Sequence, residues 1–84
     1  MPNDYASRQR QIDEMIGMYM MLMRLEGRLS ENQICEELDI GPATLRSYER
    51  GERSVPAARL YLFAEMAEVK MDFFFADMLE RLRE

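Results

Sequence analysis

Apolar residues recur at helical spacing along most of the chain. Between residues 5 and 26 one stripe repeats every three or four positions, which predicts a long helix; it contains Ile12, Met15, Ile16, Tyr19, Leu22 and Met23. A second stripe on another side of this helix contains Met18, Met21 and Leu25. A helix that is apolar most of the way round is buried on more than one side. Either another subunit covers the second stripe, or the helix is central to a small core.

Two short helices joined by a tight turn are predicted next. Ser30 and Gln33 have the spacing of a capping box at the start of the first helix. The periodic run breaks at residues 39–41, and Pro42 restarts a helix at its first position, where a missing N–H is no loss. Gly51 supplies a left-handed stop. A bihelical unit with so tight a turn is the layout of a helix-turn-helix over residues 30–50, whose second helix can enter a DNA major groove.

Two more helices complete the expected all-α, five-helix domain of residues 1–84. The fourth is predicted over residues 56–68, and Asp72 is the expected N-cap of the fifth, which runs to about residue 83. Three consecutive phenylalanines, residues 73–75, cannot all face one small core. We therefore expect the helix over 72–83 to form a symmetric homodimer surface. Its predicted members are Phe74, Phe75, Met78, Leu79 and Leu82.

Composition narrows the function classes. With one cysteine and no histidine, the chain cannot have a disulfide framework, a zinc finger or a histidine-based catalytic pair. We expect no enzyme activity, no metal and no cofactor, and we expect Cys35 to pack as a small buried hydrophobe. No apolar run reaches the ~18 residues that a membrane span requires, and no signal peptide is evident. A cytoplasmic protein without a membrane partner is expected.

The motif resembles the Cro/repressor-type helix-turn-helix family, also called the Xre family. The resemblance rests on Leu29-Ser30, Ile34-Cys35, Asp39-Ile40 and Tyr48-Glu49-Arg50-Gly51, spaced without insertion, and extends over roughly residues 20–77. It implies a DNA-binding transcriptional regulator in the cytoplasm or nucleoid, expected to be a homodimeric repressor of bacterial or phage origin.

The family pattern also implies residue roles. Arg24 and Glu49 match a buried structural ion pair between the first helix and the recognition helix. The implied DNA-binding residues are Pro42, Ala43, Thr44, Arg46, Ser47, Arg50 and Arg53. Among those that face the groove, only Arg46 and Ser47 carry donors for base edges, whereas proline and alanine can touch a thymine methyl group. Arg28 and Arg59 are further cations expected near the DNA face.

The charge distribution keeps a second hypothesis open. The chain has a net charge of −5, and residues 29–53 hold three arginines against six acids. Glu31 stands where the family usually has a phosphate-binding Gln, and its carboxylate would repel phosphate. The alternative is an acidic protein-interaction module on the same fold: an antirepressor, an antitoxin or an adaptor bound to another regulatory protein. If the arginines converge on one face with the acids opposite, DNA binding is favoured; if the two are interspersed, the interaction module is favoured.

Overall fold

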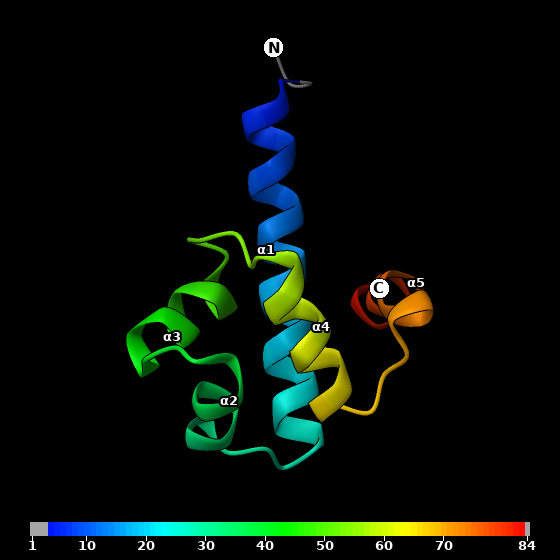
Figure 1. Ribbon diagram of the computed structural model, residues 1–84. Helices are drawn as coiled ribbons and strands as arrows, with labels where there is room; N and C mark the ends of the chain where they lie inside the picture. Colours follow the sequence, from blue (N-terminus) through cyan, green and yellow to red (C-terminus); the bar gives the residue numbers. More distant parts are fainter. Residues whose placement is uncertain (1–3, 84) are drawn as a thin grey trace.

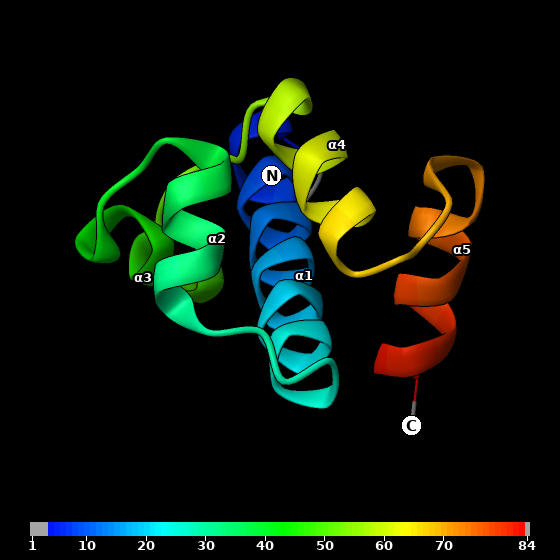
Figure 2. The ribbon, with the colours of Figure 1, turned by 60° about the horizontal axis from the view of Figure 1, so that its bottom comes forward.

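The computed structural model describes residues 4–83, and all the regular structure in this range is helical. The helices are α1 (Tyr5–Glu26), α2 (Glu31–Leu38), α3 (Pro42–Arg50), α4 (Ala57–Met66) and α5 (Met71–Leu82). Helix α1 stands at the centre, with α2 and α3 on one side and α5 on the other, and α4 lies alongside it (Figures 1 and 2). The expected all-α, five-helix fold is confirmed.

The helix ends follow from local chemistry. The Ser30 hydroxyl accepts from the backbone N–H of Gln33 at 3.0 Å, and the Gln33 side chain accepts from the N–H of Ser30 at 2.8 Å, which confirms the capping box. Helix α2 ends at Asp39, whose backbone is left-handed with φ 56°. Helix α3 begins at Pro42 and ends before Gly51, which has φ 74°, as predicted.

The predicted boundaries of the last two helices were wrong by a few residues. Asp72 is not the N-cap of α5: the helix begins at Met71, two residues before its predicted start, and Lys70 occupies the cap position without a side-chain bond. Asp72 lies inside the first turn, where its charge still suits the helix dipole. Helix α4 ends at Met66 because Glu68 adopts a left-handed conformation (φ 59°) that turns the chain toward α5.

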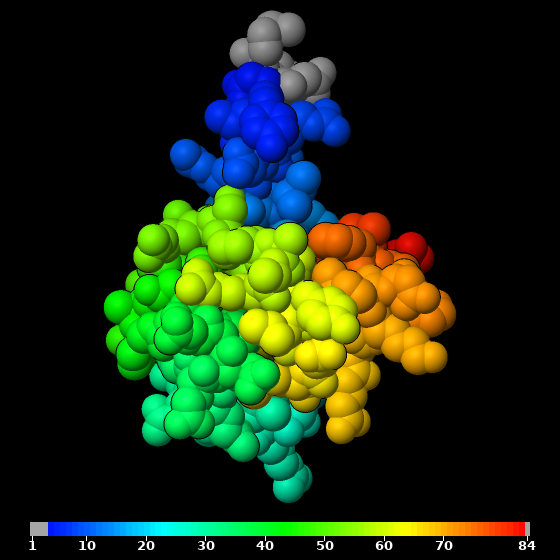
Figure 3. Space-filling view, viewed as in Figure 1, coloured from blue at the N-terminus to red at the C-terminus, as the bar shows by residue number. Residues whose placement is uncertain are grey.

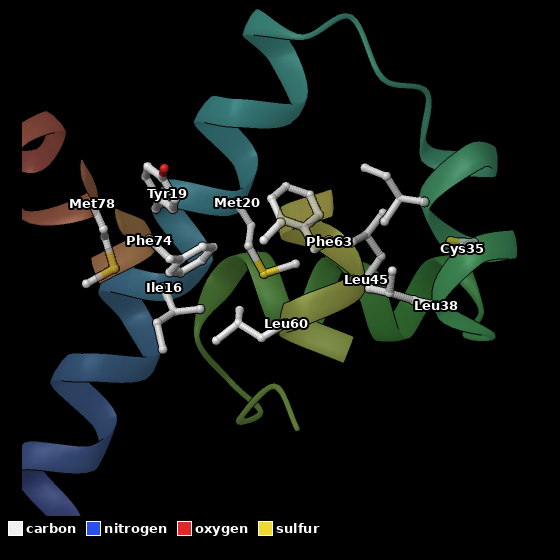
Figure 4. Packing of buried hydrophobic residues seen from close by; sticks show 12 residues of the cluster. Ile16, Tyr19, Met20, Cys35, Leu38, Leu45, Leu60, Phe63, Phe74 and Met78 are labelled. Carbon is white, nitrogen blue, oxygen red and sulfur yellow. The ribbon is translucent and has the colours of Figure 1, made fainter. Parts of the chain in front are cut away.

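One apolar core joins all five helices (Figure 4). Its fully buried large side chains are Tyr19, Met20, Ile34, Leu38, Leu45, Phe63 and Phe74. Of the two stripes of α1, the first mostly faces this core. The second stays in solvent, with exposed fractions of 53%, 40% and 60% for Met18, Met21 and Leu25. The first turns of α1 stand clear of the body of the molecule (Figure 3).

The structure corrects the predicted dimer surface. Phe74 and Met78 are buried in the core of the monomer, because helical periodicity points residues four apart toward α1. Phe74 packs edge-on against Tyr19 with 4.9 Å between ring centroids. Phe75 and Leu79 are exposed, and Leu82 is half-buried. Only these three of the five predicted residues remain available to a partner.

Polar contacts also attach α5 to α1. The Tyr19 hydroxyl donates to Asp77 at 2.5 Å, and Arg81 pairs with Glu26 at 2.7 Å. Burial, followed by the bond to Asp77, raises the pKa of Tyr19 above its ordinary value. The hydrogen bond to Glu26 likewise raises the pKa of Arg81.

Candidate nucleic-acid interface

One face of α3 is directed outward. Leu45 and Tyr48 are buried against the core, so the opposite side of the helix points away from it. On this outer side the structure exposes Pro42, Ala43, Arg46 and Arg50, while Thr44 and Ser47 are half-buried. Pro42, Ala43, Arg46, Ser47 and Arg50 therefore share the accessible side of one short helix, whereas Thr44 lies at its edge, next to the buried side.

The orientation of α3 is fixed by the Arg24–Glu49 ion pair expected from the family pattern. The Arg24 Nε donates to one Glu49 oxygen at 2.8 Å, and Nη2 donates to the other at 3.1 Å. The two side chains are 15% and 9% exposed. The hydrogen bond to Glu49 raises the pKa of Arg24, although burial acts in the opposite direction. A two-point contact of this kind restricts rotation of α3 against α1.

A close backbone approach reinforces this orientation. A Cβ atom added to Gly17 of α1 would lie 2.2 Å from the carbonyl oxygen of Tyr48 and 2.6 Å from that of Glu49. Only glycine allows α1 and α3 to come so near. This role of Gly17 was not predicted from the sequence; the signal for it was an isolated glycine within an otherwise strongly helical pattern.

Arg59, which was expected near the DNA face, connects the turn of the motif to α3. Its guanidinium donates to the carbonyl of Leu38 at 2.9 Å, the hydroxyl of Tyr48 at 3.1 Å and the carbonyl of Asp39 at 3.4 Å. The last carbonyls of a helix have no intrahelical partner and attract a cation. Arg59 thus holds the end of α2 against α3.

The loop that follows α3 is tied to α1. The Ser54 hydroxyl donates to Asp13 at 2.6 Å and accepts from the side-chain amide of Gln9 at 3.0 Å. These contacts hold the segment that carries the exposed Arg53, next to the exposed Arg50 at the end of α3. Nothing in the local sequence pattern indicated this tether, because its partners lie more than 40 residues apart.

Comparison with known proteins identifies this arrangement. A family model described as helix-turn-helix matches residues 20–74, well over half of the chain. This chain belongs to the helix-turn-helix family. The match covers the capping box, the turn, α3 and the start of α5, and it confirms the Cro/repressor-type resemblance seen in the sequence.

Curated proteins that are similar to this helix-turn-helix chain are named as transcriptional regulators. It is 32% identical over 71 residues to uncharacterized HTH-type transcriptional regulators of Rickettsia prowazekii and Rickettsia conorii. The alignments cover 84% of this chain but 55% and 57% of those proteins, so the chain spans about half their length. An uncharacterized transcriptional regulator in the ATPase CF(0) region of Rhodospirillum rubrum is 26% identical over 78 residues, which cover 93% of this chain and 72% of that protein. No solved structure matches significantly.

Acids are interspersed with the arginines of this helix-turn-helix. An Arg46 nitrogen lies 3.8 Å from a carboxylate oxygen of Glu31, the first residue of α2. Arg50 lines a hollow of about 330 Å³ together with Glu52 and with Arg10 and Glu14 of α1. The exposed face of α3 therefore carries both positive and negative charges, which is the arrangement that the interaction-module hypothesis predicts.

Two further predictions concern Cys35 and membrane-spanning helices. Cys35 is buried, and burial is the largest cause that raises the pKa of its thiol, which suits a packed hydrophobe and not a reactive thiolate. Within residues 4–83, no helix combines the length and apolarity needed to cross a bilayer.

Proposed function

We propose that the protein is a sequence-specific, DNA-binding transcriptional regulator that places α3 in a major groove. The observation that carries this proposal is the outward face of α3, held by the Arg24–Glu49 pair within a matched helix-turn-helix. Arg46 and Ser47 would contact base edges, and Pro42 and Ala43 would approach thymine methyl groups. Thr44, together with Arg50 and Arg53 at the end of the helix and in the loop, would contact phosphates; such contacts position a protein on the duplex without reading sequence.

The proposal includes a symmetric homodimer formed through the apolar flank. We use this name for Met18, Met21 and Leu25 of α1 with Phe75, Leu79 and Leu82 of α5. Met18 of α1 and Leu82 of α5 line one hollow, so the two helices meet at this point of the flank. Helices α3 and α5 lie on opposite sides of α1 (Figures 1 and 2). A partner on the flank would therefore leave α3 free, as a dimer on two half-sites about 34 Å apart requires.

Repression is the mode we propose for such a dimer. A small regulator that occupies its site can exclude other proteins from the same stretch of DNA without further machinery. A bacterial or phage origin agrees with the bacterial sources of the named relatives.

The second candidate is an acidic protein-interaction module, an antirepressor, antitoxin or adaptor. The contact between Glu31 and Arg46 favours it, because a carboxylate beside the main base-reading cation opposes the approach of DNA. The apolar flank would then be the surface that binds another regulatory protein.

Binding measurements separate the two candidates. The protein, an Arg46→Ala variant and an Arg83→Ala control at the exposed end of α5 are titrated with random duplex DNA and with the DNA upstream of their own gene, from ~50 to 200 mM salt. A regulator binds more weakly as salt rises and prefers particular duplexes. Arg46→Ala should reduce that preference about 10-fold or more, since one good arginine–base contact contributes ~1–3 kcal/mol. Arg83→Ala should leave the preference intact.

Absence of DNA binding at 50 mM salt, by protein shown to be folded, would contradict the regulator and direct attention to protein partners. An equal loss of preference in the two variants would contradict the role of Arg46.

A further inference from the structure

We propose that Glu31 and Arg46 act together as a selectivity pair, in which the carboxylate suppresses binding to arbitrary DNA more than binding to a site that offers a guanine to Arg46. This inference rests on the proposed DNA-binding function and adds a residue that determines specificity. Glu31 belongs to α2 and Arg46 to α3, and the turn of the motif brings them together at 3.8 Å.

The contact is loose and accessible. The Arg46 and Glu31 side chains are 51% and 43% exposed, compared with 15% and 9% for Arg24 and Glu49. An exposed ion pair at this distance contributes little to stability. The pair instead affects what binds at this surface, because both side chains lie beside the outward face of α3.

On arbitrary DNA the carboxylate is unfavourable. Non-specific binding depends on attraction between cations and phosphates. Glu31 adds a negative charge where α2 would meet the backbone, and it also offsets the positive charge of Arg46. At a separation of several ångströms near a protein surface, one such repulsion changes affinity by about 10-fold.

When Arg46 binds a preferred site, part of the repulsion between the Glu31 carboxylate and the phosphates is compensated. Arginine can donate two hydrogen bonds to O6 and N7 of a guanine. Its guanidinium has five N–H donors, so a contact with the base leaves donors for Glu31. The carboxylate can then orient Arg46 along the base edge, and this benefit offsets the repulsion from phosphate. The pair therefore raises the ratio of specific to non-specific affinity.

The test compares Glu31→Gln with Glu36→Gln in the full chain. Both substitutions remove one negative charge from α2, and Glu36 is exposed but has no place in the contact with Arg46. Dissociation constants are measured for a random duplex and for the duplex preferred by the wild-type protein, from ~50 to 200 mM salt. For Glu31→Gln we expect about 10-fold tighter binding to the random duplex and less than about 3-fold for the preferred one, so selectivity falls. For Glu36→Gln we expect the same small change on both duplexes.

Arg46 provides the second comparison. In an Arg46→Ala background, Glu31→Gln should tighten binding to both duplexes by the same factor, because no guanidinium remains for the carboxylate to orient. Equal tightening on both duplexes in the Arg46 protein, or equal effects of Glu31→Gln and Glu36→Gln, would overturn the selectivity pair while leaving the regulator intact. Binding to neither duplex by any of these proteins would instead overturn the proposed function itself.

Discussion

At the scale of single residues, Gly17 and Arg24 fix how α3 is presented. The Gly17 backbone lies against the last carbonyls of α3, and Arg24, seven residues later on the same side of α1, bonds Glu49. The close backbone contact at Gly17 and the ion pair of Arg24 thus both act on the C-terminal end of α3. A small change at either residue should alter the angle of the outward face.

We expect Gly17→Ala to destabilise the fold by about 2 kcal/mol. The added methyl group would overlap backbone oxygens that cannot move independently, and this overpacking exceeds the ~1 kcal/mol that alanine gains over glycine in a helix. Gly41→Ala is the control, because a Cβ there meets no atom within 4 Å. Urea unfolding measures both. A Gly17→Ala protein as stable as wild type would show that the helices can separate without cost.

Tyr19 should make stability fall in alkaline solution. Its pKa is raised in the folded state, whereas a tyrosine in an unfolded chain ionises near pH 10. The unfolded state therefore releases the proton first, so the contribution is complete below pH 10 and decreases as pH rises beyond it. The free energy of unfolding, measured from pH 8 to 11, should fall more steeply for wild type than for Tyr19→Phe, by at most ~1.4 kcal/mol per pH unit. The other tyrosines are common to both proteins, and parallel curves would contradict the assignment.

At the scale of elements, α5 has two apolar sides with different partners. Phe74 and Met78 face the core, whereas Phe75 and Leu79 face solvent. The polar residues Asp77 and Arg81 hold the helix to α1. The element is therefore an integral part of the monomer and is not held in place by a second subunit alone.

Two alanine substitutions in α5 should distinguish its core-facing side from its solvent-facing side. Met78→Ala should cost about 2–4 kcal/mol because it leaves a cavity beside Phe74 and Tyr19. Leu79→Ala, at a residue 53% exposed, should change the stability of the monomer by less than ~0.5 kcal/mol. Denaturant unfolding in dilute solution, where the midpoint no longer varies with protein concentration, makes the comparison. Similar losses for both would mean that Leu79 is also covered in the monomer.

At the scale of the whole molecule, two surfaces on opposite sides of α1 have different character. The side of α2 and α3 carries arginines mixed with acids, and α5, on the other side of α1, carries Phe75, Leu79 and Leu82 of the apolar flank (Figure 3 shows α3 and α5 at opposite edges). An 84-residue chain buries a modest share of its surface, so a dimer through the flank would add stability.

We expect the protein to be a dimer that a charged flank disrupts. Phe75→Glu combined with Leu79→Glu should give a folded monomer, because burying two carboxylates in an apolar interface is unfavourable. Phe73→Glu is the control, since Phe73 is also exposed but projects from another side of α5. Sedimentation at several concentrations gives the mass, and circular dichroism checks the fold. A monomeric wild type at high concentration, or dimers in both variants, would contradict the interface.

What the sequence determined by itself is the list of helices and the chemistry at most of their ends. Helical periodicity, the Ser30 capping box, Pro42 and Gly51 act over a few residues, so a local pattern contains all the information they need. The family resemblance supplied the Arg24–Glu49 pair. The start of α5 was the exception, because its N-cap is Lys70, which makes no side-chain cap bond, and not Asp72.

Only the tertiary structure decided which side of each helix is used. Whether Phe74 or Phe75 enters the core, whether Arg59 faces solvent or the end of α2, and whether Ser54 meets Asp13 depend on how helices cross. The contact between Glu31 and Arg46 arises in the same way. These partners lie far apart in sequence, and the packing of the common core brings them together, so no short pattern could specify them.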